Sequence, residues 1–201
     1  MTIESLFEEE PVLENESTRL EPIARRHYES LKTIALSDRD IWKFTQANII
    51  DDESFSVYFN TALDEKTAKT AYPFAIFDKK ENRYAGSTRF ANISARDKRL
   101  EIGWTWINPQ LQGSGINKHN KFLMLEFAFE KLAFNRVELK TAGTNLKSQR
   151  AMEKIGAIRE GVLRKHSIND AGISRDTVYY SFINDDWPQI KNKFFAEFMN
   201  S

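Results

Sequence analysis

The sequence lacks cysteine and has no net charge, and each absence removes a class of function. Without cysteine there is no disulfide, no catalytic thiolate and no cysteine-ligated metal. Lys plus Arg and Asp plus Glu number 29 each, which removes the broad electrostatic argument for binding nucleic acid or an anionic membrane. His27, His119 and His166 lie far apart in sequence and form no ligand pattern, so we expect no metal site.

Long apolar runs are also missing. No stretch approaches the roughly 20 residues that span a bilayer, and the acidic start from Met1 to Glu10 is unlike a secretory or transit peptide. We therefore expect a cytoplasmic protein without a membrane partner. The 201 residues, 41% hydrophobic and 29% charged, suit one globular domain. We expect residues 1–11 to be a loosely held acidic lead-in and residues 12–201 to form the domain.

Hydrophobic periodicity predicts strands and helices that alternate along the chain. The expected strands are 12–20, 72–77, 84–90, 100–107, 136–141, 158–168 and 175–183, the last two flanking a turn at 169–172. The expected helices are 22–36, 53–68, 116–133, 145–155 and a terminal one from 187 to 199. The segment from 100 to 141 needs a parallel crossover. The fold class is thus α/β, an α+β type of mixed sheet with about seven strands and flanking helices.

The strand 100–107 alternates along its length. Leu100, Ile102, Trp104 and Trp106 share one face, and Glu101 lies on the other. We expect Trp104 and Trp106 to lie in the core, although such aromatics, with Trp42, Tyr58 and Phe90, could instead line a substrate groove.

The stretch Gln110-Leu111-Gln112-Gly113-Ser114-Gly115 lies between a predicted strand and a predicted helix. Glycines allow a tight turn whose N–H groups point at one anion, and the following helix N-terminus adds further donors. The spacing matches neither a P-loop nor a dinucleotide fingerprint, which needs glycine where Lys118 stands. For these residues alone, a turn without a ligand remains the alternative.

With a second block, this turn resembles the pyrophosphate-binding motif of the GNAT acetyltransferases, Gln/Arg-x-x-Gly-x-Gly/Ala. The second block, from Asn145 to Ala157, is similar to the Asn-x-x-Ser…Lys-x-Gly segment of the RimJ/RimL-like branch, which acetylates protein N-termini and other amines. The resemblance extends from about Val12 to Trp187. It implies a GNAT-like domain whose central strands, ending at Ile107 and starting at Arg136, splay apart around the pantetheine arm of the cofactor.

The resemblance also implies acetyl-CoA as co-substrate. A backbone N–H near Ile107 or Asn108 would donate a hydrogen bond to the thioester oxygen. The ammonium of Lys118 could reach a phosphate. The expected cofactor-binding residues are Ile107, Gln112, Gly113, Ser114, Gly115, Ile116, Asn117, Asn145, Ser148 and Arg150.

Amine acetylation needs a base for the ammonium, a donor for the thioester oxygen and a proton for the leaving thiolate. Glu101 is the first candidate base, acting directly or through water, and Glu160 is the second; a solvent-facing glutamate is the alternative. Ser148 is the candidate acid, because Met152 stands where many GNAT enzymes have tyrosine. The alternative for Asn145 and Ser148 is helix capping.

We therefore predict an N-acetyltransferase that transfers an acetyl group to a primary amine by direct attack. The acceptor is a protein N-terminus, an aminoacyl compound or a small-molecule amine, and the residues leave this choice open. A non-catalytic module that senses acyl-CoA is the alternative function, and a structural domain without a ligand is a third. The resemblance makes a homodimer plausible, and no nucleic-acid partner is expected.

Overall fold

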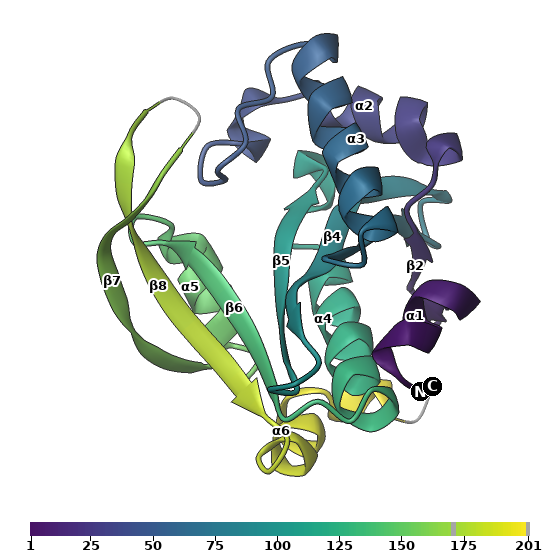
Figure 1. Cartoon of the computed structure of the whole chain (residues 1–201), viewed down its shortest axis with the longest axis vertical. Coiled ribbons are helices and arrows are strands. Elements are labelled where there is room, and N and C mark those ends of the chain that lie inside the picture. The colour runs from purple at the N-terminus through teal and green to yellow at the C-terminus, as the bar shows by residue number, and fades with distance from the viewer. Residues whose placement is uncertain (170–171, 200–201) are drawn as a thin grey trace.

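The computed structural model describes residues 1–169 and 172–199 and is built on one sheet of eight strands in the order β1-β2-β3-β4-β5-β6-β8-β7 (Figure 1). Among the strands of the described residues, only β5 and β6 are parallel neighbours. The strands are β1 (Leu13–Glu14), β2 (Thr18–Pro22), β3 (Tyr72–Asp78), β4 (Arg83–Ser94), β5 (Arg99–Ile107), β6 (Arg136–Ala142), β7 (Ile158–Ile168) and β8 (Ser174–Ile183). The mixed sheet with a parallel crossover is confirmed, with one strand more than expected.

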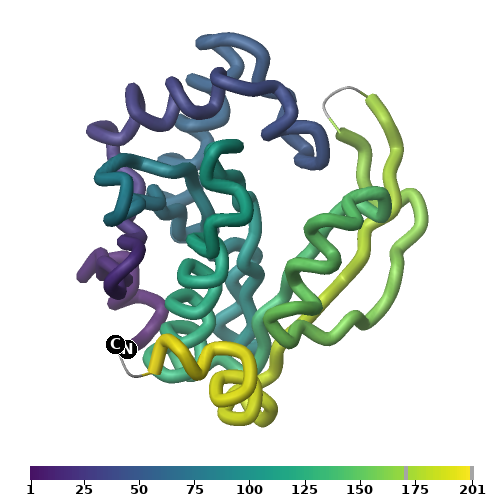
Figure 2. The backbone as a smooth tube through the Cα atoms, turned by 180° about the vertical axis from the view of Figure 1, so that it is seen from behind, coloured from purple at the N-terminus to yellow at the C-terminus, as the bar shows by residue number. Residues whose placement is uncertain are grey.

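Helices cover both faces of the sheet. The α-helices are α1 (Ile3–Glu9), α2 (Tyr28–Ala35), α3 (Asp52–Thr67), α4 (Ile116–Glu126), α5 (Leu146–Glu153) and α6 (Trp187–Phe194). Short 3-10 turns are η1 (Arg25–His27), η2 (Arg39–Ile41), η3 (Pro109–Leu111) and η5 (Ala196–Phe198), and α4 continues as a π-helical turn, η4 (Phe127–Lys131). Figure 2, seen from behind, shows α4 and α5 on the same side of the strands.

Two apolar clusters lie on opposite faces of the sheet. The larger one packs α1, α4 and α6 against strand residues such as Leu100 and Val137. The smaller one packs α2 and α3 against Ala75 and Trp106. Side chains alternate between the two faces of a strand, and neighbours of Ala75 on β3 accordingly belong to the larger cluster. The protein therefore has two cores separated by the sheet.

The N-terminal segment is held more tightly than the acidic composition suggested. Ile3–Glu9 forms α1, which Thr2 caps through a hydrogen bond from the N–H of Ser5 to its side chain. Leu6 is fully buried in the larger core, and Phe7 packs against Tyr72. The expectation of a loosely held lead-in at residues 1–11 was wrong, because helical spacing gathers the few apolar residues on one face.

Two further boundaries near the N-terminus differ from expectation. The predicted strand 12–20 is a hairpin of β1 and β2, since Asn15 accepts hydrogen bonds from the N–H groups of Ser17 and Thr18 and closes a turn. The predicted helix 22–36 begins only at Tyr28. The predicted turn at 169–172 includes residues 170–171, which lie outside the described residues.

The central strands β5 and β6 separate after three residue pairs. Arg99 to Glu101 pair with Arg136 to Glu138, and the remainder of β5 has no partner on β6. Figure 1 shows the two strands diverging from this point. We call the unpaired stretch, residues 102–107 of β5 and 139–142 of β6, the fork. The expected splay of the central strand pair is thus confirmed.

Within the part of the chain that the structure describes, no helix is long and apolar enough to cross a membrane. No group of three or more His, Asp or Glu side chains in the same residues could hold a metal ion.

Candidate active site

The turn between β5 and α4 has the backbone of an anion site. Gly113 and Gly115 have φ of 86° and 97°, left-handed values that favour glycine, and a Cβ added at either would meet only open space. Gly115 is the N-cap of α4. The N–H groups of Gly113, Gly115 and Asn117 have no acceptor among the described residues, so they remain available to a ligand. We call residues 112–117 the cradle.

Other donors of the cradle are used within it. The N–H of Gln112 bonds the carbonyl of Pro109, that of Ser114 bonds the carbonyl of Leu111, and that of Ile116 faces the Ser114 hydroxyl at 3.4 Å. Of the expected cofactor-binding residues 112–117, only Gly113, Gly115 and Asn117 therefore keep an open amide.

Asn117 also carries an unsatisfied group. Its Oδ1 atom is buried and has no hydrogen-bond partner among the described residues. A buried polar atom without a partner is costly, and this one lies in the residue next to the open amides of the cradle. The free amides and the open space fit a phosphate-bearing ligand, whereas Oδ1 of Asn117 is an acceptor and needs a hydrogen-bond donor.

The two sequence blocks meet in space. Lys147 on α5 donates a hydrogen bond of 2.6 Å to Oε1 of Gln112 in the cradle, whose Nε2 donates to the carbonyl of Ile107. Asn145 caps α5 by accepting from the N–H of Ser148 at 3.1 Å. The Ser148 hydroxyl has no partner among the described residues. The cradle, the end of β5 and the start of α5 therefore form one locality.

Arg150 and Lys118, the two side chains predicted to contact phosphate, differ in whether they form an ion pair. Arg150 is exposed on α5 and makes no ion pair with a described residue. Lys118 pairs with Glu197 beside the terminal helix, so its ammonium is engaged by a carboxylate in this structure.

A β-bulge at Trp104 divides β5 into two registers. Arg89 of β4 lies opposite Gly103, whereas Ser87 lies opposite Trp106, so β5 contributes one residue more than β4. Trp104 has a φ of 48°, which a bulky side chain rarely adopts. The bulge lies in the fork, where β5 has already left β6.

The bulge changes which residues share a face. Leu100 and Ile102 belong to the larger core, whereas Trp106 belongs to the smaller one on the other face. Trp104 is 37% exposed. The expectation that Trp104 lies in the core was wrong, because one inserted residue shifts the alternation of everything that follows it. Trp106, which is 4% exposed, does lie in a core.

Glu101 is the last residue of β5 paired with β6, and it is buried at 5% exposure. Its Oε2 accepts hydrogen bonds of 2.7 Å from Asn92 and from the ammonium of Lys140. Its side chain folds over Gly103, where an added Cβ would lie 3.0 Å from Oε1. A carboxylate held in this way at the start of the fork is fixed in position, unlike the solvent-facing glutamate of the alternative interpretation.

Glu160 has a different environment. Its carboxylate pairs with the guanidinium of Arg136 and accepts 2.7 Å from Ser181. The hydrogen bond from Arg136 lowers the pKa of the Glu160 carboxyl, and partial burial opposes this shift. The net result is a pKa below the usual value. Both oxygens are engaged in a structural pair, which leaves Glu101 as the stronger candidate base.

Of the two backbone N–H groups expected to bind the thioester oxygen, one is already used in the sheet. The N–H of Asn108 bonds the carbonyl of Ala85 at 2.7 Å. Amides alternate sides along a strand, so the N–H of Ile107 faces away from β4 and toward the fork. Ile107 is therefore the donor that the structure leaves available.

Sequence reasoning missed Lys121. This α4 residue is 7% exposed, and its Nζ donates 3.1 Å to the hydroxyl of Thr105 in the fork. Burial lowers its pKa to about 7, opposed by the charge of Glu101. Lys121 lies three and seven positions before Met124 and Ala128, which are fully buried. This helical spacing was the signal in the sequence that could have placed Lys121 on the inner face of the helix.

On the face away from α4, aromatic side chains surround the bulge. The guanidinium of Arg89 lies 5.2 Å from the ring of Trp104 and 5.5 Å from that of Tyr58, and Arg89 pairs with Glu65 at 2.5 Å. The indole of Trp106 donates to the hydroxyl of Tyr58 at 3.1 Å. The rings of Tyr58, Trp104, Trp106 and Trp42 line a small pocket. We call Trp42, Tyr58, Trp104 and Trp106 the aromatic side; Phe90, also suggested for a groove, is fully buried.

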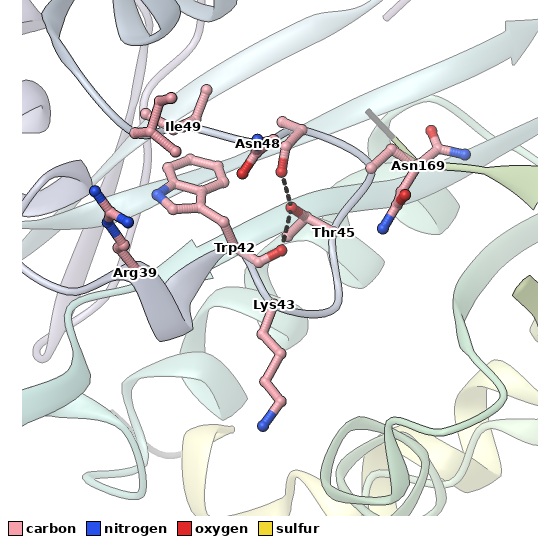
Figure 3. A pocket seen from close by; sticks show the side chains of 10 residues that line it. Arg39, Trp42, Lys43, Thr45, Asn48, Ile49 and Asn169 are labelled. Carbon is pink, nitrogen blue, oxygen red and sulfur yellow. Dashed lines mark hydrogen bonds between the residues drawn. The ribbon is translucent and has the colours of Figure 1, made fainter. Parts of the chain in front are cut away.

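A second pocket of about 190 Å³ opens beside the aromatic side (Figure 3). Its lining combines apolar, basic and amide side chains from the loop after α2 with one residue that follows β7: Trp42, Ile49, Arg39, Lys43, Asn48 and Asn169. Arg175 on β8 donates 2.6 Å to the carbonyl of Phe44 and fastens this loop to the β7–β8 hairpin. The loop and the hairpin thus close one side of the fork.

The chain was compared with known proteins. Residues 18–158 match the model of the Acetyltransferase (GNAT) domain. YdaF of Bacillus subtilis, by name a candidate ribosomal N-acetyltransferase, is 33% identical over 102 residues, which are 51% of this chain and only 55% of YdaF.

Solved structures give the same result for the fold. A candidate acetyltransferase from T. thermophilus is 32% identical, with a TM-score of 0.83 over 92% of this chain and 96% of that one. A candidate ribosomal-protein-serine acetyltransferase from Vibrio cholerae has a TM-score of 0.74 at 18% identity, covering 91% of this chain and 99% of that one, which supports the fold alone.

Proposed function

Because the chain belongs to the GNAT acetyltransferase family, we propose that it is a member of the RimJ/RimL-like branch and transfers an acetyl group from acetyl-CoA to a primary amine. One observation carries the proposal: the open amides of the cradle lie at the end of the strand on which Glu101 is held. The cradle would hold the diphosphate through Gly113, Gly115 and Asn117. Acetyl-CoA supplies the activated acetyl group.

The remaining side chains would divide the chemistry of direct attack. Glu101 accepts the proton of the acceptor ammonium, directly or through water, and the freed amine attacks the thioester carbon. The N–H of Ile107 stabilises the negative charge on the thioester oxygen. As the carbon–sulfur bond breaks, the hydroxyl of Ser148 donates a hydrogen bond or a proton to the thiolate, and the second proton lost by the attacking nitrogen ends on the thiol or replaces the proton that Ser148 gave up. No covalent enzyme intermediate is needed.

The acceptor would enter from the aromatic side, opposite α4. The name of YdaF refers to a ribosomal acceptor, which supports a protein N-terminus as the first candidate. Aminoacyl compounds and small-molecule amines are the other two classes. Aromatic and basic side chains around the pockets supply apolar area and cation–π contacts for a peptide-sized group.

The alternative function is a module that binds acyl-CoA without turnover. The buried position of Glu101, with its hydrogen bonds from Asn92 and Lys140, favours the enzyme, because a sensor does not need a fixed carboxylate next to the fork. A cytoplasmic location, a homodimer and a single N-acetyltransferase domain over residues 12–201 remain predictions.

Release of free thiol tests the proposal. The protein is incubated with acetyl-CoA and N-terminal peptides, aminoacyl nucleotides, polyamines or aminoglycosides, and products are identified by mass spectrometry. We expect thiol release that depends on one amine class and is lost in Glu101→Gln. Binding at a hundredfold excess over Kd should also stabilise the fold by about 2.7 kcal/mol. Stabilisation without thiol release would instead support the sensor.

A further inference from the structure

Lys121 is a buried lysine without a carboxylate partner. Within the described residues, no Asp or Glu oxygen lies within ion-pair distance of its Nζ, which donates its hydrogen bond to Thr105 Oγ1 at 3.1 Å. That oxygen lies 2.7 Å from Oγ1 of Thr88 on β4. Because burying a cation is costly, a lysine at this position is not explained by packing.

The fold itself would accept an apolar residue there. Met124, Leu125 and Ala128 share the inner face of the helix with Lys121 and are fully buried. A methionine has nearly the same length and would remove the cost of desolvation, so stability alone would favour it. What methionine would lose is the hydrogen bond to Thr105.

Thr105 lies on β5 between the bulge and the candidate oxyanion donor. It directly follows the bulged Trp104 and lies two residues before Ile107, whose N–H faces the fork. On the other face of the sheet, the guanidinium of Arg89 contacts the ring of Trp104. The bulge is therefore held by one basic side chain on each face.

Lys121 also links this segment to the cradle. It lies five positions after Ile116, the first residue of α4, and the cradle forms the N-terminus of the same helix. The helix thus carries free amides at its start and, about one and a half turns later, the Lys121 side chain that bonds Thr105 next to the bulge.

We propose that Lys121 is a positioning residue of the acetyl-transfer site, acting through the hydroxyl of Thr105 to fix the bulged segment of β5 and its free amides relative to the cradle. This inference rests on the proposed function. It differs from the roles assigned to Glu101, Ser148 and Ile107, because Lys121 acts on the strand and not on the reacting atoms.

Paired substitutions test the inference. Lys121→Met and Thr105→Val should each lower kcat about tenfold to a hundredfold, the range for a hydrogen bond to a charged group, while the Kd for acetyl-CoA changes less than about twofold. Thr105→Ser keeps the hydroxyl and should restore kcat. The double variant should be no slower than either single one, because both remove the same contact. Lys131→Met, an exposed lysine at the end of the same helix, is the matched control.

Hydrogen exchange of the unliganded protein provides a readout apart from activity. Amides of residues 104–107 should exchange faster in Lys121→Met and Thr105→Val than in the parent or in Lys131→Met. Unchanged exchange in both variants, or additive losses of kcat in the double variant, would overturn the positioning role. Absence of thiol release by the parent protein would overturn the proposed function, while the exchange data still decide whether Lys121 fixes the strand.

Discussion

The two sides of the fork are built by different means. The cradle side is one short contiguous segment, residues 112–117, that offers backbone amides at a helix N-terminus. The aromatic side is assembled from side chains of the loop after α2, of α3 and of β5, and the β7–β8 hairpin closes it through Arg175. Backbone groups suit a ligand part that never varies, such as a diphosphate, whereas side chains on loops can change with the acceptor.

Glu101 lies between the two sides, and its loss should have the largest effect. Glu101→Gln keeps the shape and can still contact Asn92 or Lys140, but an amide accepts no proton at neutral pH. We expect kcat to fall about 10²- to 10⁴-fold, the usual contribution of a general base, with the affinities for both substrates nearly unchanged. Undiminished turnover across the pH range would remove Glu101 from the mechanism.

A side chain at either glycine of the cradle should weaken the binding of acetyl-CoA. In Gly115→Val the new side chain would strain a left-handed backbone and occupy the space in front of the amides. We expect the affinity for acetyl-CoA to fall about a hundredfold, from strain plus lost hydrogen bonds, and the same direction for Gly113→Val. Calorimetry measures this.

Gly172→Val is the matched control for the cradle variants. Gly172 has a φ of 76° and open space around an added Cβ, but it lies in the β7–β8 connection and far from the cradle in sequence. It should be strained and still bind acetyl-CoA like the parent. Equal losses in Gly115→Val and Gly172→Val would show that strain alone is responsible.

The aromatic side should respond in the opposite way. Trp104→Ala removes an exposed ring from the acceptor side, and we expect the KM for the acceptor to rise about tenfold, in line with the loss of one aromatic contact. The Kd for acetyl-CoA should change less than about twofold. Steady-state kinetics with each substrate varied in turn distinguishes the two. A weakened acetyl-CoA affinity with an unchanged acceptor KM would reverse the assignment of the sides.

Ser148→Ala should give the smallest effect. Its N–H, which Asn145 caps, is kept, so α5 should remain folded. Losing one hydrogen bond to the leaving thiolate should lower kcat about tenfold or less. Full kcat in a folded variant would leave Ser148 without a role as acid.

What the sequence could predict follows the same division. The cradle and α5 depend on glycines, caps and spacing within short segments, so local reasoning placed them correctly. The bulge at Trp104 is set by pairing with β4, and no alternation pattern reveals an inserted residue. Lys121 was missed because its burial depends on how α4 lies on β5. Helix α1 was missed because its acidic residues concealed three apolar positions.

The amides of the cradle are proposed to hold the diphosphate of coenzyme A, and a crystal structure of the complex is the decisive test. We predict phosphate oxygens within hydrogen-bonding distance of the N–H groups of Gly113, Gly115 and Asn117, with the pantetheine arm in the fork. A diphosphate bound elsewhere on the protein would rule out the cradle as the cofactor site.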